Sequence, residues 1–98
     1  MKAYELVCAF AVEKGQGVEG IEGVQGILKN SQATIQSEKD LGDRELAYMI
    51  GRETRGHYRL FNIELEQDKL PQLEEGLKLQ KGLLRHLLVL KDEKKTDW

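Results

Sequence analysis

The hydrophobic pattern of this chain of 98 residues changes from the period of a strand to that of a helix and back, and it does so twice. The order of these changes limits the folds that the chain can adopt. The first strand pattern covers residues 3–12, AYELVCAFAV. Its larger side chains alternate onto one side, which we expect to face the core: Tyr4, Leu6, Cys8 and Phe10.

A helical pattern follows over residues 17–30. Its apolar side chains fall within about half of a helical wheel, and they are Val18, Ile21, Val24, Ile27 and Leu28. We expect this helix to stop at Asn30-Ser31.

Glycine recurs at every third position from 17 to 26 in this helix. The repeat is too short and too poor in proline for collagen, and Glu19 and Glu22 would repel a phosphate. Each interior glycine costs about 0.5–1 kcal/mol relative to alanine, so the helix is weak by itself. We expect Gly23 and Gly26 to face solvent.

Extended chain resumes at residue 33, and two further strand patterns meet at a polar segment, GRETRG, over 51–56, which we interpret as a hairpin connection. The second pattern alternates cleanly, with Phe61, Ile63 and Leu65 on one face. The first pattern mixes polar and apolar residues, which indicates either a twisted ribbon beyond the cover of the helices or a bulge.

A second helix is predicted after Asp68, a suitable N-cap, with Pro71 in the first turn. Its buried stripe is expected to consist of Leu70, Leu73 and Leu77. Gly82 then permits a turn into a last strand over 83–90.

The elements therefore follow one another as strand, helix, strand, strand, helix, strand. This order predicts an α+β fold of the ferredoxin-like, split β-α-β type, in which two helices cover one face of a four-stranded antiparallel sheet. The second and fourth strands would be its edges. We expect one domain over residues 1–91 and a short charged tail over 92–98.

Composition argues against several classes of protein. The chain has no apolar run long enough to span a membrane and no secretory cleavage site near its beginning, which favours a cytoplasmic protein. Cys8 is the only cysteine, and with only His57 and His86 as imidazoles no Cys/His metal spacing can be formed.

No nucleophile accompanies either histidine in a recognisable catalytic arrangement. We expect no catalytic residue, no metal and no cofactor. Cys8 is expected to be buried, His86 to lie at the edge of the core, and His57 and the pair Glu74-Glu75 to be solvated.

Positive charge gathers in the second half, although the net charge is −2. Residues 77–91 contain four basic side chains and no acid. Basic and aromatic residues also surround the hairpin, and the whole set is Arg44, Tyr48, Arg52, Arg55, Tyr58, Arg59, Lys78, Lys81 and Arg85. The set is typical either of a solubilising surface or of phosphate binding.

The sequence contains one candidate for a sheet whose aromatic side chains stack on RNA bases. RGHYRLFNI, residues 55–63, begins like the aromatic motif of RNA-recognition domains. His57, Tyr58 and Arg59 then depart from it, so such a platform is not supported.

Three segments resemble the bacterial small-ribosomal-subunit protein six family (bS6). They are YELV at 4–7, LGDRELAYMIGRETRGHY at 41–58 and LKLQKGLLRHLLVL at 77–90. The residues that fit its pattern are Gly42, Arg44, Leu46, Ala47, Tyr48, Ile50, Gly56, Tyr58 and Arg85, with Arg52 in place of a usual lysine. Departures are Met49 for a proline, Glu45 for a basic residue and Ala33 for a glycine.

The resemblance implies a non-enzymatic protein of the cytoplasmic ribosome that binds the central domain, or platform, of 16S rRNA. It also implies a heterodimer with small-subunit protein eighteen, with a monomer expected when the chain is free. RNA contact is carried over to Lys2, Arg44, Tyr48, Arg52, Lys78 and Arg85. Because a sheet edge can accept an extended peptide, we expect protein eighteen near the second strand.

The fold alone leaves an alternative, since ferredoxin-like domains also serve as regulatory or small-ligand-binding domains. The sequence contains no glycine-rich or polar signature for a ligand cleft. A small enzyme on the same scaffold would need an acid/base pair, and the sequence does not suggest one.

Overall fold

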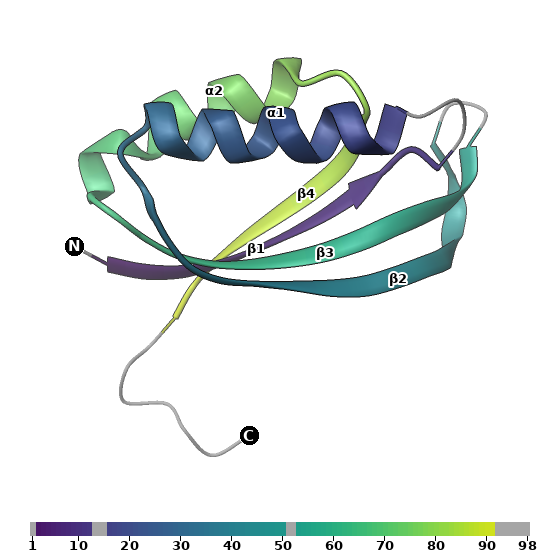
Figure 1. The fold of residues 1–98 in the computed structure, drawn as a ribbon, viewed down its shortest axis with the longest axis horizontal. Helices are drawn as coiled ribbons and strands as arrows, with labels where there is room; N and C mark the ends of the chain where they lie inside the picture. The colour runs from purple at the N-terminus through teal and green to yellow at the C-terminus, as the bar shows by residue number, and fades with distance from the viewer. Residues whose placement is uncertain (1, 13–15, 51–52, 92–98) are drawn as a thin grey trace.

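Four strands form a single sheet in the computed structural model, which describes residues 2–12, 16–50 and 53–91 (Figure 1). The chain order is β1 (Lys2–Phe10), α1 (Gln16–Asn30), β2 (Thr34–Ile50), β3 (Glu53–Leu65), a 3₁₀ turn (Gln67–Lys69), α2 (Leu70–Leu79) and β4 (Leu83–Leu90). The predicted tail, 92–98, lies outside the described residues.

The strand order across the sheet is β2-β3-β1-β4, and every neighbouring pair is antiparallel. Both helices lie on one face of the sheet, and the other face is open (Figure 1). The ferredoxin-like arrangement predicted from the element order is therefore confirmed, with β2 and β4 as the edges.

The core lies between the two helices and the covered face of the sheet. The alternation in β1 is confirmed, because Tyr4, Leu6, Cys8 and Phe10 are all buried. They join alternate residues of β3 and one stripe from each helix, namely Phe61, Ile63, Leu65, Val24, Leu28, Leu73 and Leu77. Each large side chain buried here contributes about 1.5–3 kcal/mol, which stabilises helices that are weak alone.

Helix α1 buries a narrower stripe than the sequence predicts. Val18 is 62% exposed and does not belong to the core. At this end of α1 the helix backbone itself approaches the sheet, since a Cβ on Gly20 would lie 2.7 Å from Cδ1 of Phe10. Gly23 is not solvent-facing either, because a Cβ there would collide with the side chain of Gln80. Only Gly26 of the expected pair has open space around it.

The end of α1 falls where the sequence predicts it. Gln32 takes a left-handed conformation with φ of 66°, and its N–H donates to the carbonyl of Lys29 at 3.0 Å. The N–H of Ala33 donates to the carbonyl of Leu28 at 2.9 Å. These two bonds form a Schellman motif, in which glutamine holds the position that glycine usually takes.

Asp68 does not cap α2. It lies in the 3₁₀ turn, which moves the start of the helix to Leu70, and Lys69 at the N-cap makes no side-chain capping bond. Pro71 stands in the first turn as predicted, where its missing N–H needs no partner. Gly82, with φ of 86°, reverses the chain into β4.

The hairpin connection is shorter than the sequence predicts. Strand β3 begins at Glu53, which pairs with Ile50, and Gly56 pairs with Arg44. Thr54 and Arg55 are exposed strand residues, so their polarity resembles that of a turn. Residues 51–52, which link the two strands, lie outside the described part of the chain.

Candidate nucleic-acid interface

Strand β2 contains the bulges that its mixed pattern indicates. Its register against β3 shifts between Ile35 and Ser37, between Asp40 and Gly42, and again before Ile50. At the second shift Leu41 is the extra residue, and Gly42 takes φ of 85°. This left-handed conformation is open to glycine and strained for other residues.

The bulge at Leu41 sorts charged side chains onto opposite faces of the sheet. Before the bulge, Asp40 pairs with Arg59, at a position of β3 that shares the face of the core. After it, Arg44 pairs with Gly56, which shares the open face. Side chains alternate between faces, so two even-numbered residues of a regular strand would point the same way. The extra residue therefore turns Arg44 onto the open face and away from Asp40.

Two acids of β2, Glu38 and Asp40, point to the helix side and form contacts there. Nε of Arg59 donates to Oε1 of Glu38 at 3.0 Å, and its Nη1 lies 3.9 Å from Oδ2 of Asp40. Gln25 of α1 donates to the same Glu38 carboxylate. Arg59 is thus committed to an ion pair inside the domain and is a poor candidate for RNA.

His57 is also held on this side, and it is not simply solvated as the sequence predicts. Its Nε2 lies 2.9 Å from Oδ1 of Asp40, and its Nδ1 lies 2.6 Å from Oδ1 of Asp43. The imidazole therefore links β3 to β2 on both sides of the bulge.

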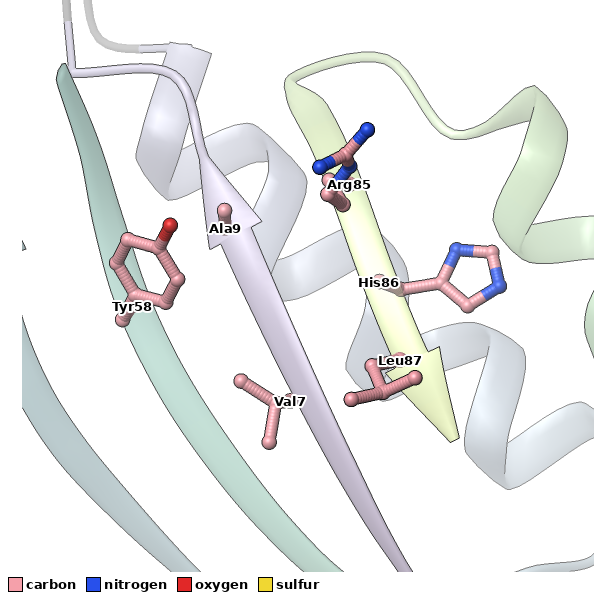
Figure 2. Close-up of a pocket in the computed structure, with 6 residues that line it drawn as sticks. All are labelled: Val7, Ala9, Tyr58, Arg85, His86 and Leu87. Atoms are coloured by element: carbon pink, nitrogen blue, oxygen red, sulfur yellow. The ribbon is translucent and has the colours of Figure 1, made fainter. Parts of the chain in front are cut away.

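Tyr58 of β3 and Arg85 of β4 flank Ala9 of β1 in the register of the sheet. Because alanine is small, the two larger side chains leave a hollow between them (Figure 2). The hollow measures about 410 Å³ and is lined by Val7, Ala9, Tyr58, Arg85, His86 and Leu87. A tyrosine ring and a guanidinium on the two sides of one hollow can contact a base or sugar and a phosphate of the same RNA strand.

The side chain of His86 points away from the hollow, toward α2 (Figure 2). Its Nε2 lies 2.7 Å from Oε1 of Glu74, and 19% of the side chain is exposed. The prediction of a histidine at the edge of the core is confirmed. The prediction that Glu74 is merely solvated is wrong, because its carboxylate meets this imidazole.

Two of the predicted RNA-binding residues lie on the open face near the hairpin. Arg44 and Arg85 stand on the two edge strands, with Tyr58 between them. The side chain of Tyr48 and the whole of Arg52 lie outside the described residues.

Lys2 and Lys78 lie away from the hairpin end of the open face. Lys2 begins β1, seven residues from Ala9, which at 3.3 Å per residue is about 23 Å away. The open face beside it carries the acids Glu5 and Glu64. Lys78 is exposed in the last turn of α2, in the helix layer. The basic region of the open face is therefore its hairpin end.

The sequence reasoning missed Lys39 as a candidate. It pairs with Leu60 and so shares the open face with Arg44, although the numbering of the two residues differs by an odd number. The available signal was Gly42 inside a strand pattern, which often marks a bulge. Tyr58 was recognised as part of the aromatic and basic set, but only the register shows that it lies between the two arginines.

Burial raises the pKa of the Cys8 thiol to about 12, so the group stays protonated. Within the described ranges, no three His, Cys, Asp or Glu side chains are arranged to hold a metal ion. The helices that the structure describes are too short or too polar to cross a membrane.

The amino-acid pattern agrees with one known family over almost its whole length. The family model described as Ribosomal protein S6 matches residues 3–90. The chain belongs to the ribosomal protein S6 family. Among curated relatives, small ribosomal subunit protein bS6 of Treponema pallidum is 36% identical over 92 residues, which cover 94% of this chain and 99% of that protein. The bS6 protein of Treponema denticola is 40% identical over 89 residues, covering 91% and 96%.

The fold agrees with that of a solved S6 structure. The crystal structure of 30S ribosomal protein S6 from Thermotoga maritima superposes with a TM-score of 0.80 over 92% of this chain and 87% of that one. At 19% identity this likeness shows the fold alone. The bS6 relatives are ribosomal proteins of the small subunit, so the resemblance noted in the sequence is confirmed at the level of the family.

Proposed function

We propose that this S6-family chain binds the central domain, or platform, of 16S rRNA together with small-subunit protein eighteen, as a part of the cytoplasmic ribosome. The observation that supports the proposal is the sorting of charge by the bulge at Leu41. It puts Arg44 on the open face, where Tyr58 and Arg85 also lie, while the neighbouring acids face the helices. A negative RNA backbone would therefore meet the hairpin end of the open face.

The chain would neutralise few phosphates by itself. Its net charge is −2, and on the open face the acids Glu5 and Glu64 stand at the end opposite the arginines. Each phosphate that a protein neutralises releases counterions and steepens the dependence of binding on salt. A basic partner would supply much of the remaining attraction, which is the role that we assign to protein eighteen.

Protein eighteen is expected at β2, one of the two edges of the sheet. An edge offers unpaired N–H and C=O groups to an extended segment. With β2 occupied by the partner and the hairpin end facing RNA, the two ligands would meet at the same side of the domain. Free in solution, the chain is expected to be a monomer.

The test is binding to a platform fragment of 16S rRNA over a series of salt concentrations, with and without protein eighteen. We expect tight, salt-dependent binding of the pair and weak binding of this chain alone. Absence of binding in both cases at low salt would exclude the proposed function.

A further inference from the structure

The two edges of the sheet are built differently. Strand β2 is interrupted by three register shifts and carries charged side chains on both faces, so a partner can pair only with short parts of it. Strand β4 has one irregularity, at its beginning, and Arg85 and His86 are its only polar residues. In the part of the chain that the structure describes, no strand pairs with the outer side of β4.

The hydrogen-bond pattern shows which backbone groups point outward from β4. The N–H of Lys91 donates to the carbonyl of Ala3 at 2.9 Å. In an antiparallel pair, residues that exchange hydrogen bonds alternate with residues that do not. The odd-numbered residues from 85 to 91 therefore bond to β1. The even-numbered residues of the regular part of β4 direct their N–H and C=O groups to the outer edge, and these are His86, Leu88 and Leu90.

The side chains along this edge are apolar and accessible. Leu87 is 61% exposed, Val89 is 43% exposed and Leu90 is 54% exposed. Leu87 also lines the hollow beside Arg85, so the apolar surface continues from the edge onto the open face (Figure 2).

The charge around β4 indicates which kind of segment would bind there. Residues 77–91 contain four basic residues and no acid. Lys78 lies in the helix layer, and Nζ of Lys91 donates to Oδ1 of Asn62 at 3.2 Å. Arg85 is exposed on β4, and Lys81 is exposed in the turn before it. Glu74, the carboxylate that approaches β4 from α2, lies 2.7 Å from Nε2 of His86. A second copy of the chain would bring the same basic residues against this edge. An acidic segment would complement it.

From these features we infer that β4 binds an extended, acidic segment of another protein, which adds to the sheet as a fifth strand. In antiparallel register the segment has apolar residues opposite Val89 and Leu87 and an acid opposite Arg85. Read from its N-terminus, its pattern is apolar, any, apolar, any, acidic. Backbone pairing supplies affinity, and the alternate side chains supply specificity. This edge is separate from the β2 edge assigned to protein eighteen. It shares Arg85 with the proposed RNA contact, so the segment and RNA would compete for that side chain.

A capped eight-residue peptide tests the inference, with a valine, a leucine and a glutamate placed in that pattern among threonines. A matched peptide has lysine in place of the glutamate. Titration of the isotope-labelled full chain should change the amide signals and slow the hydrogen exchange of His86, Leu88 and Leu90. The lysine peptide should bind about five- to tenfold more weakly, because it places like charges opposite each other.

Two substitutions at one site separate backbone pairing from side-chain contact. Leu90→Pro removes an outward N–H while leaving the bonds between β4 and β1 in place, and Leu90→Ala keeps that N–H. We expect the glutamate peptide to lose affinity with Leu90→Pro and to retain more of it with Leu90→Ala.

Two results of the titrations would overturn the inference, namely equal binding of the two peptides and peptide signals confined to β2. Self-association of the chain through β4, seen by sedimentation and abolished by Leu87→Glu but not by Leu79→Glu, would equally overturn it in favour of a second copy.

Discussion

Oδ1 of Asp40 accepts a hydrogen bond from the N–H of Gly42 at 2.8 Å, and this contact closes the bulge that turns Arg44 onto the open face. This hydrogen bond therefore bears both on the stability of the domain and on the proposed binding of RNA. The same backbone conformation that glycine permits decides which side of the sheet receives the arginine.

Gly42→Ala should destabilise the domain even though nothing lies within 4 Å of the position that a Cβ would take. The penalty comes from the backbone, because φ of 85° is costly for a residue with a Cβ, by about 1–2 kcal/mol. Urea unfolding measures the effect as a lower midpoint. An unchanged midpoint would mean that the strand can relax the bulge.

Gly26→Ala should have the opposite effect on stability. This helical glycine also has nothing within 4 Å of the Cβ position, so alanine should raise the free energy of unfolding by about 0.5–1 kcal/mol. Gly20→Ala is the control inside the same helix, since its Cβ would lie 2.7 Å from Phe10 and 3.1 Å from the backbone of Gly82. It should destabilise. Equal effects of the two substitutions would contradict this account of α1.

Most of the fold could be predicted from the sequence because its elements are strongly periodic. The alternation in β1 and the final strand over 83–90 agree with the structure. The errors arose where tertiary contacts override a local signal. Val18 fits the helical stripe but stands outside the core, and Asp68 fits a cap but lies in a 3₁₀ turn.

The candidate interface could be predicted only in part. The resemblance identified Arg44 and Arg85, whereas the face on which Arg44 lies depends on one inserted residue, Leu41. A shift of one residue exchanges the two faces of a strand, and a mixed pattern of polar residues does not specify where the shift occurs. The same uncertainty concealed the pairing of Arg59 with Glu38.

The double substitution Arg44→Ala with Arg85→Ala should weaken binding of the heterodimer to the platform RNA and reduce its dependence on salt. Each lost phosphate contact should lower the salt slope by about 0.7–0.9. Lys29→Ala is a matched loss of charge in the last turn of α1, away from the open face, and should change neither quantity. The contribution of the two arginines would be refuted by an unaltered slope in the double variant.

Ala47→Pro tests the position of protein eighteen on β2. Proline lacks the N–H that an edge can offer to a partner and restricts the local backbone. We expect the heterodimer to weaken while the isolated domain stays folded, which circular dichroism would confirm. Formation of the heterodimer at the original affinity would place protein eighteen elsewhere.

Cys8 should make stability decline at alkaline pH. Burial raises the pKa of this thiol from 9.0 to about 12, so the folded state keeps the proton while the unfolded state releases it above pH 9. Below pH 9 both states are protonated, and the group has no effect on the pH dependence. Between pH 9 and pH 12 the unfolded state binds fewer protons, and the thiol lowers the free energy of unfolding by about 1.4 kcal/mol per pH unit.

Comparison with Cys8→Ala isolates this contribution from those of lysine and tyrosine, which titrate in the same range. The variant should be less stable than the original chain at pH 8, because it leaves a small cavity in the core. The difference in the free energy of unfolding between the two proteins, or stability gap, should narrow by about 1.4 kcal/mol on going to pH 10, as measured by urea unfolding at each pH. A constant gap would show that the thiol ionises equally in the two states, which its burial opposes, since a thiolate in the apolar interior would lack solvation.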